Sequence, residues 1–344
     1  MDQIVLLHCS DVHFGEIPAN NRFFPGPMRG QNAHDFQLCL GLNPAMEDIR
    51  DLTGLPDDEE IRIVVSGDLT ATGGHKEYLV GHSFLRSLYR IRREPASDVA
   101  GFDIRANRTT EDLPLRAVPG NHDHWWGSRL MWAKNPNIRG SHFRNTSWLL
   151  PWRSGALVLE VGGLDSCAGV DPKKRNIKQI GKLDLSKGGE VERLKDLLRK
   201  SDKAGLPQGA TARVRTIVVH HSLAYAGGWW GALKLDDASK QALLEVAEEF
   251  RIAAFLTGHT HDFFFDPPFD TLPKRSSKVY ELRCASTLQG PHSRDDPEAP
   301  GFWAHKIWVE RGQAKWTSWR YYWNGSSRFE PKDRKKPCVD FPAP

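Results

Sequence analysis

Apolar residues form short, nearly continuous runs along the first three quarters of the chain, and several of these runs stop at a small polar cluster. The runs cover residues 4–9, 61–65, 115–118, 157–164, 214–219 and 252–256. A continuous apolar run of four to eight residues is typical of a strand buried on both faces of a sheet. The runs therefore predict strands in the interior of an α/β protein.

Helical patterns lie between these runs. Residues 191–198 carry apolar side chains at the spacing of an amphipathic helix, and a second helix is predicted at about 239–250. A third is predicted over 42–52, with Asn43 as its N-cap and Pro44 at its first position. The Pro- and Asn-rich residues 16–33 and the charged residues 90–112 predict loops.

The pattern changes to alternation after about residue 263, where Gly312 joins two predicted strands as a hairpin. The tryptophans of this region favour sheet packing over a base-stacking surface. A single α/β domain with two stacked sheets over residues 1–325 fits best, with core motifs in 5–262 and a β-rich completion in 263–325. Residues 326–344 are expected to form a basic, Pro-containing tail.

Composition narrows the class of protein. The 344 residues are 39% hydrophobic and 26% charged, as in an ordinary globular enzyme, and a net charge of +4 argues against extended duplex binding. The five cysteines show neither zinc-site nor redox-pair spacing, which favours a reducing compartment. With no signal-peptide pattern and no apolar run of membrane-spanning length, the expected location is the cytoplasm.

Five predicted strands end at residues that bind metals well. Because strand ends of an open α/β sheet meet at one rim, these side chains are expected to lie together. Each alone is more often loop polarity or a helix cap, but five such strand ends in one chain favour a metal site. The candidate ligands are Asp11, His13, Asp68, Asn121, His220, His259 and His261.

The ligand set indicates two cations that share a carboxylate. Two cations about 3.5–4 Å apart need an anionic group between them, and Asp68 is the natural bridge. Mixed nitrogen and oxygen ligands suit manganese, iron, zinc, cobalt or nickel better than magnesium or calcium, and manganese is favoured here. Such a centre acidifies a bridging water and holds a phosphoryl group for in-line attack by the resulting hydroxide.

The strand-end motifs together resemble those of the calcineurin-like metallophosphoesterases. They are Ser10-Asp11-Val12-His13, Ser66-Gly67-Asp68, Gly120-Asn121-His122-Asp123, His220-His221 and Gly258-His259-Thr260-His261. The resemblance covers residues 5 to about 262 and implies a four-layer α/β/β/α sandwich of two mixed sheets, with the metals at the strand ends.

The resemblance also implies a role for each motif residue. It assigns one metal to Asp11, His13, Asp68 and His261, and the other to Asp68, Asn121, His220 and His259. It makes His122 the group that protonates the leaving oxygen or stabilises the transition state, with Asp123 orienting it. His220 rather than His221 is taken as the ligand because it directly follows the apolar run.

The substrate is less well defined than the metal site. The segment 67–73, Glu77-Tyr78 and Leu164-Asp165-Ser166 are similar to the branch that contains class III cyclic-nucleotide phosphodiesterases. They favour a phosphodiesterase for a small or nucleotide diester. Side chains next to the motifs are candidates for substrate binding: His124, His221, Trp229 and Trp230.

Two alternatives remain open. The same metal core cleaves DNA or RNA in related enzymes, often with a partner protein, and the aromatic C-terminal region is compatible with that use. A non-catalytic scaffold that binds a partner is the alternative of another class, although the full ligand set and His122 argue against it. A protein partner or a homo-oligomer is compatible with either hypothesis.

Overall fold

Two β-sheets face one another in the computed structural model, which describes residues 2–15, 36–57, 59–81, 117–124, 143, 146–170, 181–224, 234–260, 264–265, 279–289, 300–325, 328–335, 337 and 339–342. The first sheet has the order β11 (Phe329–Pro331), β10 (Gln313–Trp323), β9 (Gly301–Glu310), β1 (Gln3–Cys9) and β2 (Ile61–Val65), and β12 (Val339–Pro342) also pairs with β10. The second has the order β3 (Trp148–Ser154), β4 (Leu157–Gly163), β5 (Ala212–Val218), β6 (Ala254–Thr257), β8 (Tyr280–Arg283) and β7 (Phe264–Phe265).

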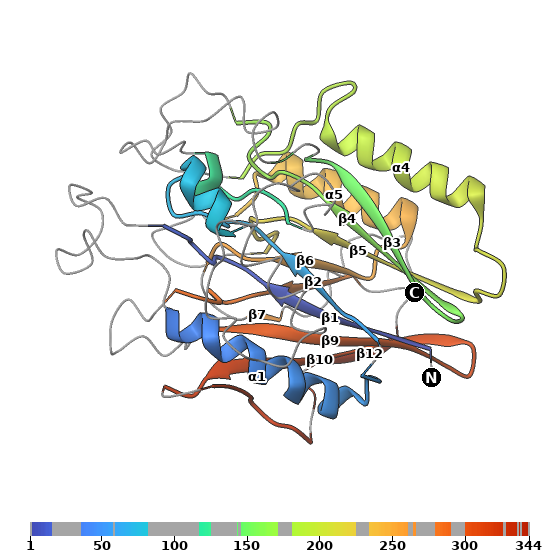
Figure 1. Cartoon of the computed structure of the whole chain (residues 1–344). Helices are drawn as coiled ribbons and strands as arrows, with labels where there is room; N and C mark the ends of the chain where they lie inside the picture. Colours follow the sequence, from blue (N-terminus) through green and yellow to red (C-terminus); the bar gives the residue numbers. More distant parts are fainter. Residues whose placement is uncertain are drawn as a thin grey trace.

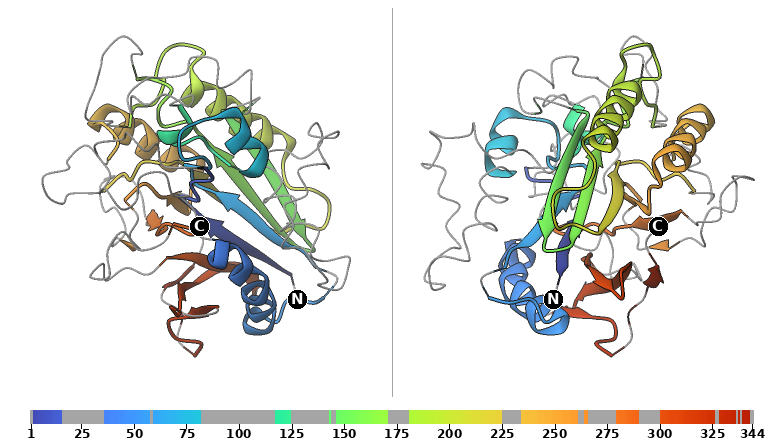
Figure 2. Two further views of the ribbon diagram at one scale, coloured as in Figure 1. Left: turned by 60° about the vertical axis from the view of Figure 1, so that its left-hand side comes forward. Right: turned by 90° about the vertical axis from the view of Figure 1, so that its right-hand side faces the viewer.

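Both sheets mix parallel and antiparallel pairs. β1 is parallel to β2 and antiparallel to β9, while β4, β5, β6 and β8 run parallel to one another. Contacts of β1 with β3 and β4 place the inner faces of the two sheets together. The expected α/β/β/α sandwich is confirmed, because α1 (Phe36–Thr53) covers one outer side and α4 (Glu190–Ala204) and α5 (Asp237–Phe250) cover the other (Figures 1 and 2).

The helix α1 begins earlier than the sequence pattern predicts. It starts at Phe36 rather than near Asn43, so Pro44 lies inside the helix and not in its first turn. A proline inside a helix costs about 3 kcal/mol, chiefly through a lost backbone hydrogen bond. Burial of Leu38 and Leu42, upstream of the proline, offsets that cost. None of the described helices is long and apolar enough to cross a membrane.

The strand β3 has no clear signal in the sequence because Pro151 interrupts it. Pro151 lies opposite Glu160 of β4, and β3 forms one edge of the second sheet. An edge strand needs backbone partners on one side only, so it tolerates a residue without an N–H group.

Three of the C-terminal tryptophans pack in the core against the first sheet. Trp303 and Trp316 are fully buried and Trp319 is 8% exposed, which confirms the predicted use in packing for these three, whereas Trp308 and Trp323 are partly exposed. Part of the segment expected to be a tail also joins this sheet, since β11 and β12 both pair with β10. Alternation of apolar and polar residues over 339–341 is consistent with this pairing.

Two buried histidines lie in the first sheet. His8 on β1 and His305 on β9 stack with ring centroids 5.9 Å apart. His8 Nε2 lies 2.9 Å from Ser66 Oγ, and His305 Nδ1 lies 2.7 Å from Ser318 Oγ. Burial lowers the pKa of His8 to about 3 and holds the pKa of His305 well below its ordinary value. Both rings therefore stay neutral in the folded protein at mildly acidic pH.

We expect this pair to destabilise the metal-free protein as the pH falls. Below the ordinary histidine pKa of about 6.5 the unfolded chain takes up two protons that the folded chain excludes, so the free energy of unfolding decreases. The two sites together are expected to account for about 4 kcal/mol between pH 7 and pH 5. Urea unfolding with chelator at both pH values measures the change. His305→Gln should remove about half of it, and an unaltered pH dependence would contradict this account.

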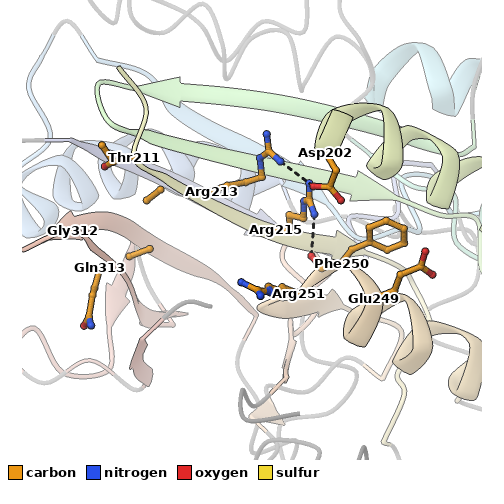
Figure 3. Close-up of a pocket in the computed structure, with 11 residues that line it drawn as sticks. Asp202, Thr211, Arg213, Arg215, Glu249, Phe250, Arg251, Gly312 and Gln313 are labelled. Atoms are coloured by element: carbon orange, nitrogen blue, oxygen red, sulfur yellow. Dashed lines mark hydrogen bonds and ion pairs between the residues drawn. The ribbon is translucent and has the colours of Figure 1, made fainter. Parts of the chain in front are cut away.

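A hollow of about 760 Å³ lies at the rim where β5 begins (Figure 3). The Oδ1 atom of Asp202 lies 3.1 Å from Arg213 Nη1 and 2.6 Å from Arg215 Nη2. Arg215 also pairs with Glu160 at 2.7 Å. These ion pairs join β5 to α4 and β4 at the end of the sheet remote from the strand-end motifs.

Candidate metal centre

The loops after β1, β2, β5 and β6 meet at one rim of the sandwich. Asp11 N donates to the Gly67 carbonyl at 3.1 Å, and Gly258 N donates to the His220 carbonyl at 3.0 Å. His259 N donates to Asp11 Oδ2 at 2.9 Å and so links the loops of the two sheets. The predicted convergence of strand ends is therefore present in the structure.

Backbone strain is concentrated at this rim. Asp11, His13 and Asp68 have φ near 50°, and His259 has φ of 73°. Residues other than glycine adopt this left-handed region at a cost that surrounding structure must offset, and such residues cluster at functional sites. Only two further described non-glycine residues, Arg251 and Arg311, have positive φ. The strain therefore marks four of the predicted ligands.

The predicted ligands of one metal surround a single imidazole nitrogen. His220 Nε2 lies 3.0 Å from Asn121 Oδ1, 3.2 Å from Asp68 Oδ2 and 3.1 Å from His259 Nδ1. One nitrogen carries at most one proton, which cannot satisfy three neighbours. Atoms bound to one cation at about 2.0–2.1 Å in a tetrahedron lie roughly 3.3 Å apart. The four atoms thus fit a divalent ion.

The predicted ligands of the other metal are spaced more widely. His13 Nε2 lies 3.8 Å from Asp11 Oδ1 and 4.0 Å from Asp68 Oδ2. Both spacings are shorter than about 4.2 Å, which is twice a metal–nitrogen bond, so one ion can contact His13 together with either carboxylate. His261, the remaining predicted ligand, lies outside the described residues. Asp68 contributes to both ligand groups, as a bridging carboxylate must.

A backbone carbonyl sets the orientation of His220. His220 Nδ1 lies 2.8 Å from the Ser66 carbonyl oxygen, which can only accept, so Nδ1 carries the proton. Nε2, which faces the other ligands, is then the nitrogen that a cation would bind in place of a proton. This is the second hydrogen bond that commonly fixes the tautomer of a metal-binding histidine. The geometry therefore supports the choice of His220 over His221.

The charges of the metal-free site favour cation binding. Burial opposes ionisation of Asp68, but the nearby His220, His122 and His13 hold its pKa well below the ordinary value. Burial likewise opposes protonation of His220, yet Asp68 raises its pKa to about 9. The pKa of His259 is held well below its usual range by burial and by the neighbouring His221 and His220. The site thus consists of a buried, ionised Asp68 carboxylate surrounded by imidazole rings.

His122 faces this centre from the turn η3 (His122–His124). Its Nδ1 donates to the Ala71 carbonyl oxygen at 2.8 Å, and its Nε2 lies 3.9 Å from Asp68 Oδ2. The ring is partly exposed, with 15% of its side-chain area accessible. This geometry leaves Nε2 as the atom able to exchange a proton with a bound ester.

Asp123 does not have the expected position against the His122 ring. It accepts hydrogen bonds from Gly120 N at 2.9 Å and from Thr70 N and Oγ1 at 3.0 and 2.8 Å. Burial and the neighbouring Asp68 raise the pKa of Asp123 to about 7. The expectation is corrected: Asp123 joins two loops, and the Ala71 carbonyl orients His122.

Two of the four residues proposed to bind substrate are buried in the protein interior. His124 is 3% exposed and its Nε2 lies 3.1 Å from Asp165 Oδ1. His221 is fully buried and its Nδ1 lies 2.7 Å from Ser166 Oγ. Neither ring faces the surface in this structure, because the two side chains point into the fold although they adjoin the motifs in sequence. Trp229 and Trp230 lie outside the described residues.

The motif glycines permit close packing at the metal centre. A Cβ atom on Gly120 would lie 2.1 Å from Asp68 Oδ1 and 2.4 Å from Asp68 N. Gly120→Ala must therefore displace the bridging carboxylate, and we expect it to weaken Mn²⁺ binding by about 10-fold or more. Gly74→Ala is a matched control, since its Cβ would lie 3.4 Å from Glu77 Cδ, an ordinary contact. Isothermal titration measures both; equal affinities would contradict the close-packing argument.

Comparison with known proteins agrees with this geometry. The family model for calcineurin-like phosphoesterases matches residues 4–263. The structure is similar to a dimetal phosphatase from Danio rerio, with a TM-score of 0.53, 12% identity and coverage of 99% of this chain and 98% of that chain. It also matches GAP50, the anchor in the inner membrane complex of Plasmodium, with a TM-score of 0.49, 12% identity and coverage of 97% and 91%.

No curated protein sequence matches the chain significantly. The structural matches have low identity, so they support the fold alone, whereas the family match covers most of the chain. Fold and family together define a metal-dependent hydrolase of phosphoric esters. The chain belongs to the calcineurin-like phosphoesterase family.

Proposed function

We propose that the protein is a dinuclear phosphodiesterase that acts on a small or nucleotide phosphodiester, with Mn²⁺ as its preferred ion. The observation that supports the two-metal part of this proposal is that Asp68 belongs to two groups of candidate ligands, one with His13 and one with His220 and His259. Two divalent ions held there supply a nucleophile from water near neutral pH and neutralise charge on the phosphoryl oxygens.

Hydrogen bonds within the chain orient the groups that would take part in the reaction. Asp68, held at Oδ1 by His122 N at 2.8 Å, presents Oδ2 to both ligand groups. His122, held at Nδ1 by Ala71, presents Nε2 on the exposed side of the site. In its protonated form His122 donates a proton to the leaving oxygen as the P–O bond breaks. His259, His220 and Asn121 hold the opposite side of the centre.

A small diester is favoured over nucleic acid by the C-terminal region. The described tryptophans that a base-stacking platform would require are mostly buried in the first sheet. The similarity of residues 67–73 to the cyclic-nucleotide branch supports the same choice. The non-catalytic scaffold is disfavoured because the described ligands remain together and His122 retains an accessible nitrogen.

The cellular compartment and the binding partners are also part of the proposal. The four described cysteines, Cys9, Cys39, Cys167 and Cys284, are buried free thiols, which is consistent with a reducing cytoplasm. A protein partner or a second copy of the chain remains compatible with this placement.

A panel of esters in the presence of Mn²⁺ tests the proposal. Bis-p-nitrophenyl phosphate and cyclic AMP are expected to be hydrolysed, and p-nitrophenyl phosphate and single-stranded DNA more slowly. His122→Ala is the comparison with reduced activity on cyclic AMP, and His75→Ala, at an exposed histidine, is its matched control. Preferential DNA cleavage would replace this proposal with a nuclease. Absence of any turnover with two ions bound would support the scaffold instead.

A further inference from the structure

The segment after β4 contacts both loops that carry the ligands around His220. Asp165 and Ser166 follow the last residues of this strand, where Leu164 N donates to the Val218 carbonyl of β5 at 3.1 Å. Both residues are buried, with Asp165 at 1% exposure and Ser166 at 0%. Neither is among the predicted metal ligands.

Asp165 holds the loop that carries Asn121 and His122. Its Oδ1 lies 3.1 Å from His124 Nε2, and an ionised carboxylate only accepts, so His124 donates. His124 N in turn donates to the Asn121 carbonyl at 3.2 Å, which closes the turn. Displacement of His124 must therefore move the residue that bears the amide ligand.

Ser166 holds the loop that carries His220. Its Oγ accepts from His221 N at 3.3 Å and lies 2.7 Å from His221 Nδ1, to which its hydroxyl can donate. On the other side, a Cβ on Gly181 would lie 2.4 Å from His221 Cγ, so the ring has little room to move. His221 directly follows His220, and its fixed ring limits where the ligand can go.

The Asp165-Ser166 segment is itself anchored. Asp165 N donates to Glu190 Oε2 at 3.2 Å, and Oδ1 of Asp165 also accepts from Cys167 N at 2.8 Å. Lys182 N donates to the Ser166 carbonyl at 2.6 Å. Glu190 is the first residue of α4 and is fully buried, so a hydrogen bond connects the segment to a helix of the outer layer.

A different segment supports the other metal. Ser286 Oγ donates to the Asp11 carbonyl at 2.8 Å, and Thr287 N donates to the Ser10 carbonyl at 2.9 Å. These residues follow β8 and contact the loop of Asp11 and His13. The two ions would therefore be supported from opposite sides by two independent sets of hydrogen bonds.

We propose that Asp165 and Ser166 are positioning residues that set the affinity of one ion of the pair, the ion held by Asn121, His220 and His259. The proposal rests on the two-metal centre of the proposed function and assigns these residues no contact with substrate. Loss of such outer partners typically lowers metal affinity by about 10- to 100-fold. The ion held by Asp11 and His13 should keep more of its affinity, because the contacts of Ser286 and Thr287 with its loop are unchanged.

Stepwise Mn²⁺ titration of the metal-free protein tests this inference. Electron paramagnetic resonance of the loaded protein then distinguishes single ions from coupled pairs. Asp165→Ala and Ser166→Ala should each weaken one binding step by about 10-fold or more and leave a single-ion spectrum at two equivalents. Asp165→Asn should restore the coupled spectrum, because its amide oxygen still accepts from His124. Ser286→Ala is the matched control and should weaken the other step.

Equal weakening of both steps, or of neither, would overturn the inference. A third ion that is lost in Cys167→Ser would also overturn it, because His124, Asp165 and Cys167 could then be metal ligands. Thermal unfolding of each metal-free variant identifies any that do not fold; Asp165→Asn then decides, since rescue requires the hydrogen bond. The titration needs no substrate, so a site-selective loss in a protein that hydrolyses no ester would reject the proposed function and retain this inference.

Discussion

Asp68→Ala is expected to abolish turnover and to weaken both ions at once. Asp68 Oδ2 is 3.2 Å from His220 Nε2 and 4.0 Å from His13 Nε2, so it is the carboxylate that both ligand groups share. Loss of a residue that hydrogen-bonds to a metal ligand lowers metal affinity by up to about 100-fold. Loss of a ligand that both ions share should lower the affinity of each ion by more than that. Metal analysis after dialysis and hydrolysis of bis-p-nitrophenyl phosphate measure the two effects.

The matched control for this change is Asp202→Ala. Asp202 is also a carboxylate paired with cationic groups, but it lies at the far rim, beside the start of β5 (Figure 3). Asp68→Asn tests charge separately, since asparagine tolerates the left-handed backbone of this position while removing the anion. If Asp68→Ala retained two tightly bound ions, the assignment of Asp68 as the bridge would be rejected.

Strands that are buried on both faces could be predicted from the sequence. Runs such as 4–9 and 214–219 have no alternative that buries them as well, and they became β1 and β5. Prediction failed where tertiary packing overrode a local rule. Pro44 indicates a helix start, yet α1 continues upstream of it because the residues there pack in the core.

The grouping of the proposed metal ligands could be predicted because their chemistry depends on side-chain type and on position at strand ends. The atoms that orient them could not. The Ser66 and Ala71 carbonyls have no signature in a sequence, since every residue has a carbonyl group. Asp165 is 41 positions from its partner His124, and only the fold brings them together.

Proximity in sequence to a motif was a poor guide to substrate contact. His124 and His221 adjoin motif residues but face inward, because the turn after a strand directs successive side chains to different sides. Their burial accounts for their hydrogen bonds with Asp165 and Ser166. Among the described residues at the proposed centre, His122 keeps a partly exposed ring.

His122→Ala is expected to keep both ions and to lose most of the rate. The His122 ring binds Ala71 through Nδ1 and has no ligand role in the proposed centre, so metal content should be unchanged. A general acid contributes about 10²- to 10⁴-fold to a rate, and kcat should fall by that amount with little change in KM. Metal analysis and steady-state kinetics on cyclic AMP measure the two quantities.

The choice of leaving group separates proton donation from charge stabilisation by His122. p-Nitrophenolate departs without a proton, whereas the sugar alkoxide released from cyclic AMP needs one as the P–O bond breaks. If His122 donates that proton, His122→Ala should impair cyclic AMP hydrolysis far more than hydrolysis of bis-p-nitrophenyl phosphate. Equal losses on the two substrates would instead assign His122 to stabilising charge on the phosphoryl oxygens. His75→Ala, at an exposed histidine, should leave both rates intact.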